Sequence, residues 1–234
     1  MAPSGATGRQ RPPLSNDAVG ERQKAAAARA SAELIEDGMR VGLGTGSTVA
    51  HLLPAIAERG CRDLRCVATS PATAAAAAAL GLRVASLDEL GELDIAIDGA
   101  DQIDPRGWLV KGGGGAHTRE KIVASAARRF IVIASAEKAV HELSAPVPVE
   151  LLEFGVARTL LALAPARLRD VPTSPDGGLI ADYLGPVADP RELSDRLSCT
   201  PGLIEHGLFA PELVSTILIA SEQGVEVREG AKKV

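Results

Sequence analysis

Short apolar runs and longer alanine-rich stretches alternate along the first part of this chain. Each apolar run has the length and the aliphatic content of a buried strand. We therefore expect strands at 40–43, 64–68, 83–85, 93–97 and 130–134. Helices are expected over 17–37, from 48 to about 59, and over the polyalanine stretch 74–79. Strands and helices alternating at this spacing predict an α/β protein with a doubly wound, mostly parallel, Rossmann-like sheet.

The pattern changes after Ser144, where we expect a smaller C-terminal α+β domain. The expected elements are a proline-punctuated extended segment at 146–150, a helix at 151–164, strands around 178–184, a helix near 191–197 and a strand at 214–220. We expect this last strand to return to the main sheet. The predicted division is a large domain (17–147 and 212–234) and a small domain (148–211). Residues 1–16 lack an apolar segment and are expected to be a disordered leader, not a signal peptide.

Composition excludes several classes of function. A net charge of −5 without a dense basic stripe argues against nucleic-acid binding. The chain has no apolar run of 18 residues, so we expect no membrane span and a cytoplasmic protein. Three cysteines without close spacing support neither a disulfide framework nor a zinc site, and the four histidines are scattered. Aromatic residues are 2% of the chain, so aliphatic side chains must build its core.

Polar residues follow four of the expected strands. They are Thr45, Ser47 and Thr48; Ser70 and Thr73; Asp98 and Asp101; and Lys138. Ligands of open α/β sheets bind outside the carboxyl ends of the strands, so these loops indicate one shared site. The Gly44–Thr48 turn precedes a helix start, an arrangement that binds phosphate, although a tight turn with a helix cap has the same pattern.

The segment 98–121 carries the densest chemistry. It holds three aspartates, Lys111, four consecutive glycines (Gly112 to Gly115) and Glu120. A lone glycine run is usually a flexible loop. Here the neighbouring aspartates, Lys111 and Glu120 favour a site at which backbone N–H groups approach an anion. Asp104 precedes Pro105 and is expected to be a turn residue. Trp108 is expected to anchor the loop.

Four segments together resemble the ribose-5-phosphate isomerase A family. They read GLGTGST (42–48), DGADQID (98–104), KGGGGAHTREK (111–121) and PGLIEHGLF (201–209). The resemblance runs from about Lys24 to the C-terminus. It implies a metal-free, cofactor-free interconversion of ribose 5-phosphate and ribulose 5-phosphate, with no nucleic-acid or membrane partner, by a homodimer or homotetramer.

Roles are implied residue by residue. Glu120 resembles the general base that moves a proton between C1 and C2 through an enediolate, as a glutamate does in triosephosphate isomerase. Asp98 and Lys111, with Asp101 beside them, resemble the groups that handle ring opening and the O1 and O2 hydroxyls. The implied substrate-binding residues are Lys24, Thr45, Gly46, Ser47, Thr48, Gly112, Gly113, Gly114 and Lys138.

The sequence departs from the family pattern in places. Gln102 replaces a usual glutamate and is expected to point away from the neighbouring acids. His117 stands where an aliphatic residue is common, close enough to affect the pKa of Glu120. Two alternatives stay open: a sugar-phosphate deaminase or CoA transferase on a related fold, and a sugar-phosphate-sensing domain without turnover.

Overall fold

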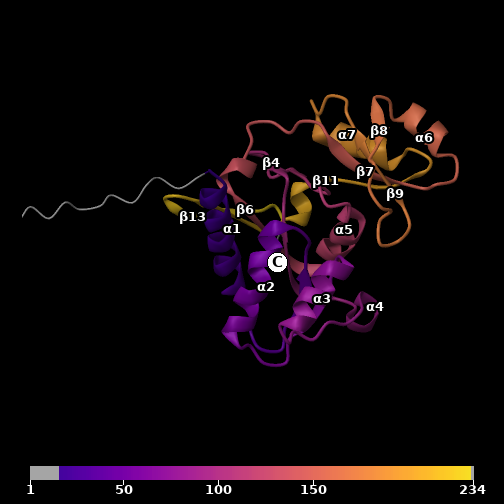
Figure 1. Ribbon diagram of the computed structural model, residues 1–234. Coiled ribbons are helices and arrows are strands. Elements are labelled where there is room, and N and C mark those ends of the chain that lie inside the picture. The colour runs from indigo at the N-terminus through magenta and orange to yellow at the C-terminus, as the bar shows by residue number, and fades with distance from the viewer. Residues whose placement is uncertain (1–15, 233–234) are drawn as a thin grey trace, which may run out of the picture.

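The computed structural model describes residues 16–232 (Figure 1). Its helices are α1 (Asn16–Ala32), α2 (Ser47–Arg59), α3 (Pro71–Ala79), α4 (Leu87–Leu90), α5 (His117–Ala126), α6 (Val156–Ala162) and α7 (Pro190–Ser198), with 3₁₀ turns η1 (Ala136–Lys138) and η2 (Pro211–Leu213). Its strands are β1 (Arg40–Leu43), β2 (Arg65–Ala68), β3 (Leu93–Gly99), β4 (Gln102–Ile103), β5 (Leu109–Val110), β6 (Ala127–Ser135), β7 (Val147–Leu151), β8 (Ala166–Leu168), β9 (Leu179–Tyr183), β10 (Leu203–His206), β11 (Leu208–Phe209), β12 (Thr216–Ser221) and β13 (Gly224–Glu229). Residues 1–15 of the expected leader lie outside the described part.

A six-stranded sheet forms the centre of the large part of the molecule. Its strand order is β13-β12-β6-β3-β1-β2, and every pair is parallel except the β12–β13 hairpin. The predicted α/β class with a mostly parallel sheet is confirmed. Strand β12 does return to this sheet, beside β6. Because β1, β3 and β6 are parallel, their carboxyl ends and the loops that follow them meet at one edge.

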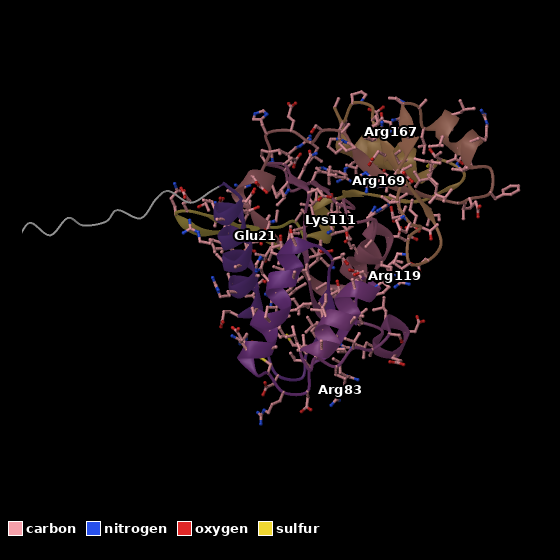
Figure 2. The ribbon with its side chains drawn as sticks, in the orientation of Figure 1. Glu21, Arg83, Lys111, Arg119, Arg167 and Arg169 are labelled. Carbon is pink, nitrogen blue, oxygen red and sulfur yellow. The ribbon has the colours of Figure 1, made fainter. Side chains whose placement is uncertain are left out.

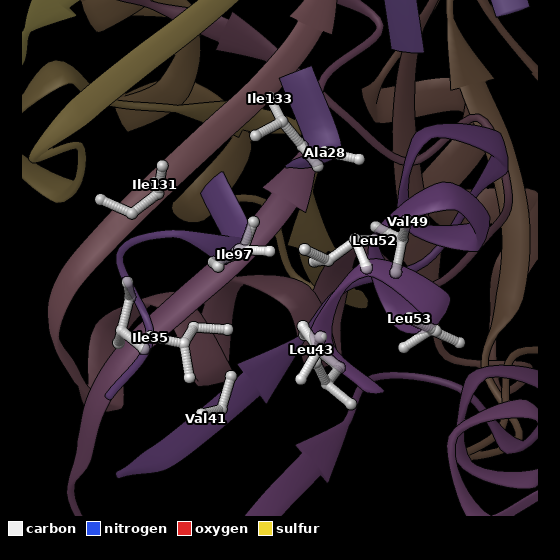
Figure 3. Close-up of a cluster of buried hydrophobic side chains, with 14 of the residues drawn as sticks. Ala28, Ile35, Val41, Leu43, Val49, Leu52, Leu53, Ile97, Ile131 and Ile133 are labelled. Atoms are coloured by element: carbon white, nitrogen blue, oxygen red, sulfur yellow. The ribbon is translucent and has the colours of Figure 1, made fainter. Parts of the chain in front are cut away.

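Aliphatic side chains build the core on both faces of this sheet. On one face, Ala28 of α1 and Leu52 of α2 pack against Ile97 of β3 and Ile131 of β6 (Figure 3). On the other face, Val123 of α5 packs with a second set of strand residues. Strand side chains alternate between faces, which is how one strand supplies both clusters. This packing fixes α2 and α5, whose first turns carry site residues.

A second, antiparallel sheet has the order β10-β7-β9-β8 and packs with residues of α6 and α7. We propose that it forms the small domain expected over 148–211. A third sheet, β11-β5-β4, was not expected from the sequence. Its strands are two residues each, too short for a periodic pattern to reveal.

Three expected elements differ in the structure. Helix α1 ends at Ala32, and a turn then buries Ile35 in the core. The strand expected at 83–85 is a single parallel bridge between Val84 and Cys66, because Ser86 at once caps α4. The helix expected at 151–164 starts later: Leu151 still belongs to the central strand β7, and Gly155, with φ of +73°, begins α6.

Candidate active site

A cavity of about 150 Å³ opens at the carboxyl edge of the parallel sheet. The predicted residues that line it are Thr45, Gly46, Ser47, Thr48, Asp101, Lys111, Gly112, Gly113, Gly114, Glu120 and Lys138. Gly99 and Ala100 line it too; they are the two small residues between Asp98 and Asp101 and were not singled out from the sequence. The sequence feature that could have identified Gly99 and Ala100 as lining residues is their position between Asp98 and Asp101.

Three buried charges lie together at this cavity: Lys111 and Glu120 line it, and Asp98 lies behind the lining in contact with Lys111. Lys111 Nζ lies 2.8 Å from Asp98 Oδ2 and 3.0 Å from Glu120 Oε2, and it donates a hydrogen bond of 2.6 Å to the carbonyl of Gly99. All three side chains are at most 5% exposed. Asp98 ends β3, Lys111 follows β5, and Glu120 lies in the first turn of α5. Two carboxylates therefore share one lysine away from bulk water.

Burial and charge shift the pKa values of all three groups. Burial, together with the Asp98 charge, raises the pKa of Glu120 to about 7, and Lys111 only partly opposes this. Burial also raises the pKa of Asp98, again against the pull of Lys111. Burial lowers the pKa of Lys111, but the two carboxylates outweigh it, so the pKa ends above its ordinary value. The lysine stays charged, and one carboxyl can hold or release a proton near neutral pH.

Backbone donors decide which carboxyl does so. Asp98 Oδ1 accepts hydrogen bonds from the N–H groups of Thr45 at 3.1 Å and Gly99 at 2.7 Å, which favour its ionised form. Glu120 accepts no such bond in the described residues, so its carboxyl is the easier one to protonate. Asp98 comes so close to the β1 loop that a Cβ on Gly44 would meet Oδ1 at 1.9 Å. Only glycine fits there.

The first turn of α2 forms another wall. Gly46 precedes the helix with φ of +118°, and no side chain caps it. The N–H groups of Ser47 and Thr48 have no acceptor in the described residues, and both residues line the cavity. Uncapped N–H groups and the positive end of the helix dipole form an anion site. Lys138, on the loop after β6, adds a positive charge to the lining.

The glycine run closes the cavity opposite this helix end. Gly112 and Gly115 have φ of +102° and +73°, which favour glycine. The N–H of Gly113 donates to Asp101 Oδ2 at 2.8 Å, so Asp101 holds the loop as well as lining the cavity. The N–H groups of Gly112 and Gly114 have no acceptor in the described residues.

Two predicted site residues, Asp98 and Lys24, are outside the cavity lining. Asp98 still contacts the lining residue Lys111, whereas Lys24 lies apart. It is not among the residues that line the cavity, and its Nζ forms an ion pair with Glu21 at 2.7 Å. His51 bonds the other oxygen of the same carboxylate at 2.8 Å. The role of Lys24 in substrate binding stays a prediction.

His117 does not act on Glu120. It is fully buried, its Nε2 lies 3.3 Å from the carbonyl of Glu205, and burial lowers the pKa of the imidazole to about 4. It therefore stays neutral near pH 7 and places no charge beside Glu120. Its place is a packing one: a Cβ on Gly112 would meet His117 Nδ1 at 2.7 Å.

Three smaller expectations can be followed in the structure. Gln102 does turn from the acids, since its amide donates to the carbonyl of Ser144. Asp104 is a turn residue that accepts from the N–H groups of Arg106 and Trp108. Trp108 is 5% exposed and packs into the core of the second sheet. Within residues 16–232, no cluster of three or more His, Cys, Asp or Glu could hold a metal ion, and no helix could span a membrane.

Comparisons with known proteins identify the family of this chain. Residues 65–224 match the ribose 5-phosphate isomerase A (phosphoriboisomerase A) family. A ribose-5-phosphate isomerase A from Caulobacter vibrioides is 44% identical over 218 residues, which are 87% of this chain and 96% of the relative. One from Rhodopseudomonas palustris is 43% identical, over 89% of this chain and 97% of the relative.

Solved structures of ribose 5-phosphate isomerases have a similar fold. Ribose 5-phosphate isomerase A from Neisseria gonorrhoeae superposes with a TM-score of 0.86 at 32% identity, over 90% of this chain and 97% of that one. A D-ribose-5-phosphate isomerase in complex with phospho-erythronic acid gives 0.85 at 34% identity, over 90% and 99%. The chain therefore belongs to the ribose 5-phosphate isomerase A family, whose members are isomerases of a pentose phosphate.

Proposed function

We propose that this chain interconverts D-ribose 5-phosphate and D-ribulose 5-phosphate through an enediolate, with Glu120 as the general base. The observation that carries the proposal is the Glu120 carboxyl itself. It is buried, its pKa is raised to about 7, and it faces the same cavity as an uncapped helix end. A base with a pKa near the working pH both takes and returns a proton efficiently. The solved relative that holds phospho-erythronic acid, a sugar-acid phosphate, supports this class of ligand.

The proposed roles of the other residues follow from their charge and position. The N–H groups of Ser47 and Thr48, with Lys138, bind the phosphate. Lys24 lies outside the cavity lining, and its expected contact with the phosphate would require it to leave Glu21. Asp98 assists ring opening by moving a hydroxyl proton.

In the open-chain aldose, Glu120 removes the proton from C2. The electrons of that C–H bond form the C1–C2 double bond, and O1 becomes an oxyanion. The protonated Glu120 then delivers the proton to C1, while O2 becomes the carbonyl oxygen and its proton moves to O1. Lys111 and the N–H of Gly114 stabilise the negative charge on oxygen. No redox partner is consumed.

The test is direct turnover. Purified protein is mixed with ribose 5-phosphate in EDTA, and ketose formation is followed beside the Glu120→Gln and Glu205→Gln variants. We expect turnover that resists the chelator, collapses in Glu120→Gln and persists in Glu205→Gln, whose glutamate pairs with Lys121 outside the cavity. Absent turnover, with ribose 5-phosphate still raising the melting temperature, would favour a sensing domain instead.

We also propose that the chain assembles as a homodimer or homotetramer. Large apolar side chains are exposed on the small domain, with Phe154 94% and Leu161 69% accessible. Such exposure is typical of surfaces that become covered by a partner. Light scattering measures the mass in solution, and a monomer at working concentration would contradict the proposal.

A further inference from the structure

The glycine run has a second face, turned away from the site cavity. A separate hollow of about 530 Å³ lies against Gly113, Gly114 and Gly115, and Arg169 is among its lining residues. Arg169 is not among the residues that line the site cavity. It therefore approaches the glycine run from the side opposite to the proposed substrate.

All three guanidinium nitrogens of Arg169 donate hydrogen bonds. Its Nη1 donates to the carbonyl of Gly112 at 3.0 Å and to that of Gly113 at 3.1 Å. Its Nε and Nη2 donate hydrogen bonds of 3.0 and 2.7 Å to the two carboxylate oxygens of Asp182, on β9. The Arg169 and Asp182 side chains are 18% and 14% exposed. The ion pair neutralises the arginine and fixes its plane. Arg167, Arg169 and Lys111 are labelled in Figure 2.

Peptide geometry carries this contact to the other face. The peptide bonds of the run are trans, so a carbonyl and the following N–H point in opposite directions. The Gly112 carbonyl meets Arg169, and the Gly113 N–H on the other side meets Asp101, a residue of the site cavity. By the same rule, the Gly113 carbonyl on Arg169 turns the Gly114 N–H towards the cavity. That N–H has no acceptor in the described residues.

We propose that Arg169, held by Asp182, is a positioning residue that orients the glycine run and presents the Gly114 N–H to the oxygen on which charge develops. Without this anchor the Gly113–Gly114 peptide plane keeps no partner among the described residues, and a carbonyl turned inward would repel the oxyanion. The Gly112–Gly113 plane stays held, because the Gly115 N–H donates to the Gly112 carbonyl and the Gly113 N–H donates to Asp101. This inference rests on the proposed function. It adds that the small domain sets the geometry of donors in a site that its own side chains do not enter.

The experiment compares Arg169→Met, Arg169→Lys and Arg167→Met in the full chain, with ribose 5-phosphate as substrate. Arg167 is the matched control, because it lies two residues away and its side chain is exposed, without a hydrogen bond or ion pair among the described residues. Its backbone pairs with Asp182 in the sheet and is unaffected by the substitution. We expect kcat to fall about 10²-fold in Arg169→Met with KM changed only a few-fold, because donors lose alignment and not substrate contact. Lysine lacks the planar fork and should restore only part of the rate. Arg167→Met should match the wild type.

A rescue separates positioning from a general loss of structure. Millimolar guanidinium added to a folded Arg169→Ala variant should raise its kcat several-fold and leave Arg167→Ala unchanged. Wild-type kcat in both Arg169→Met and Arg169→Lys, a change in KM alone, or no rescue by guanidinium would overturn the inference. An inactive wild-type protein would instead remove the proposed function, so the two failures are distinguishable.

Discussion

Two neighbouring residues of α5, Glu120 and Lys121, belong to two different charge clusters, the first buried and the second half-buried. In the first, Asp98 and Glu120 share Lys111. In the second, Lys121 Nζ lies 2.6 Å from Glu205 and donates to the carbonyl of His206 at 2.7 Å. Consecutive helix residues point about 100° apart, which is why one helix supplies both clusters. The ring of Phe209 lies between the two lysines, 5.5 Å from Lys111 Nζ and 5.0 Å from Lys121 Nζ.

The two clusters differ in charge balance and access. Lys121 has one carboxylate partner, and burial lowers its pKa while Glu205 opposes the shift. His206 beside it stays neutral, because burial and Lys121 lower its pKa to about 3. Neither Lys121 nor Glu205 lines the site cavity. We propose that removal of charge from water is not what distinguishes the catalytic cluster here. The distinguishing feature is the extra carboxylate, Glu120, which lines the cavity.

The largest effect should come from removing the extra carboxylate. Glu120→Gln keeps the shape of the side chain but cannot carry the proton, so we expect kcat to fall about 10²–10⁴-fold. The melting temperature at pH 8 should stay equal or rise, since an acid with a raised pKa destabilises the fold when it is ionised. A steady-state assay and a thermal melt check both. A Glu120→Gln variant with a lowered melting temperature but an unchanged kcat would reverse our assignment of the two clusters.

Removing Lys121 should do the opposite. Lys121→Met leaves Glu205 without its cation and the His206 carbonyl without its donor. We expect these losses to outweigh the gain from removing a cation whose pKa is lowered by burial, so the free energy of unfolding should fall by about 1–3 kcal/mol with kcat nearly unchanged. Urea denaturation measures the loss. Arg128→Met is the control, because its pair with Glu92 is exposed and should contribute less than about 1 kcal/mol. Equal losses in the two variants would mean that the Lys121 cluster is not structural.

The smallest effect concerns the ring between the clusters. Phe209→Leu removes the aromatic face from both lysines and should cost about 1 kcal/mol of stability and a few-fold in kcat. Phe130→Leu is matched, since this buried ring packs 6.4 Å from Phe209 and faces neither lysine in the described contacts. It should lower stability alone. An equal loss of kcat in both variants would show that general packing is responsible.

The sequence predicted the first cluster because its members belong to one motif-rich segment. Asp98, Lys111 and Glu120 stand within 23 residues, and the parallel sheet order follows from the alternation of strands and helices. The second cluster was not predicted from the sequence, because Lys121 contacts Glu205 and His206 across more than 80 residues and no local pattern links them. The contacts of Arg169 with the glycine run were not predicted for the same reason. Lys24 was visible, but its pairing with Glu21 depends on which face of α1 turns to the site.

The role of Glu120 as general base is best tested by the pH dependence of kcat/KM for ribose 5-phosphate in the wild type and in Lys121→Met. A general base works when deprotonated, so the rate should rise about tenfold per pH unit and level off above the pKa of Glu120, at about 7. We expect this limb in both proteins, because Lys121 belongs to the other cluster. A limb that levels off near the ordinary glutamate value of 4.5, or one that moves when Lys121 is replaced, would contradict it.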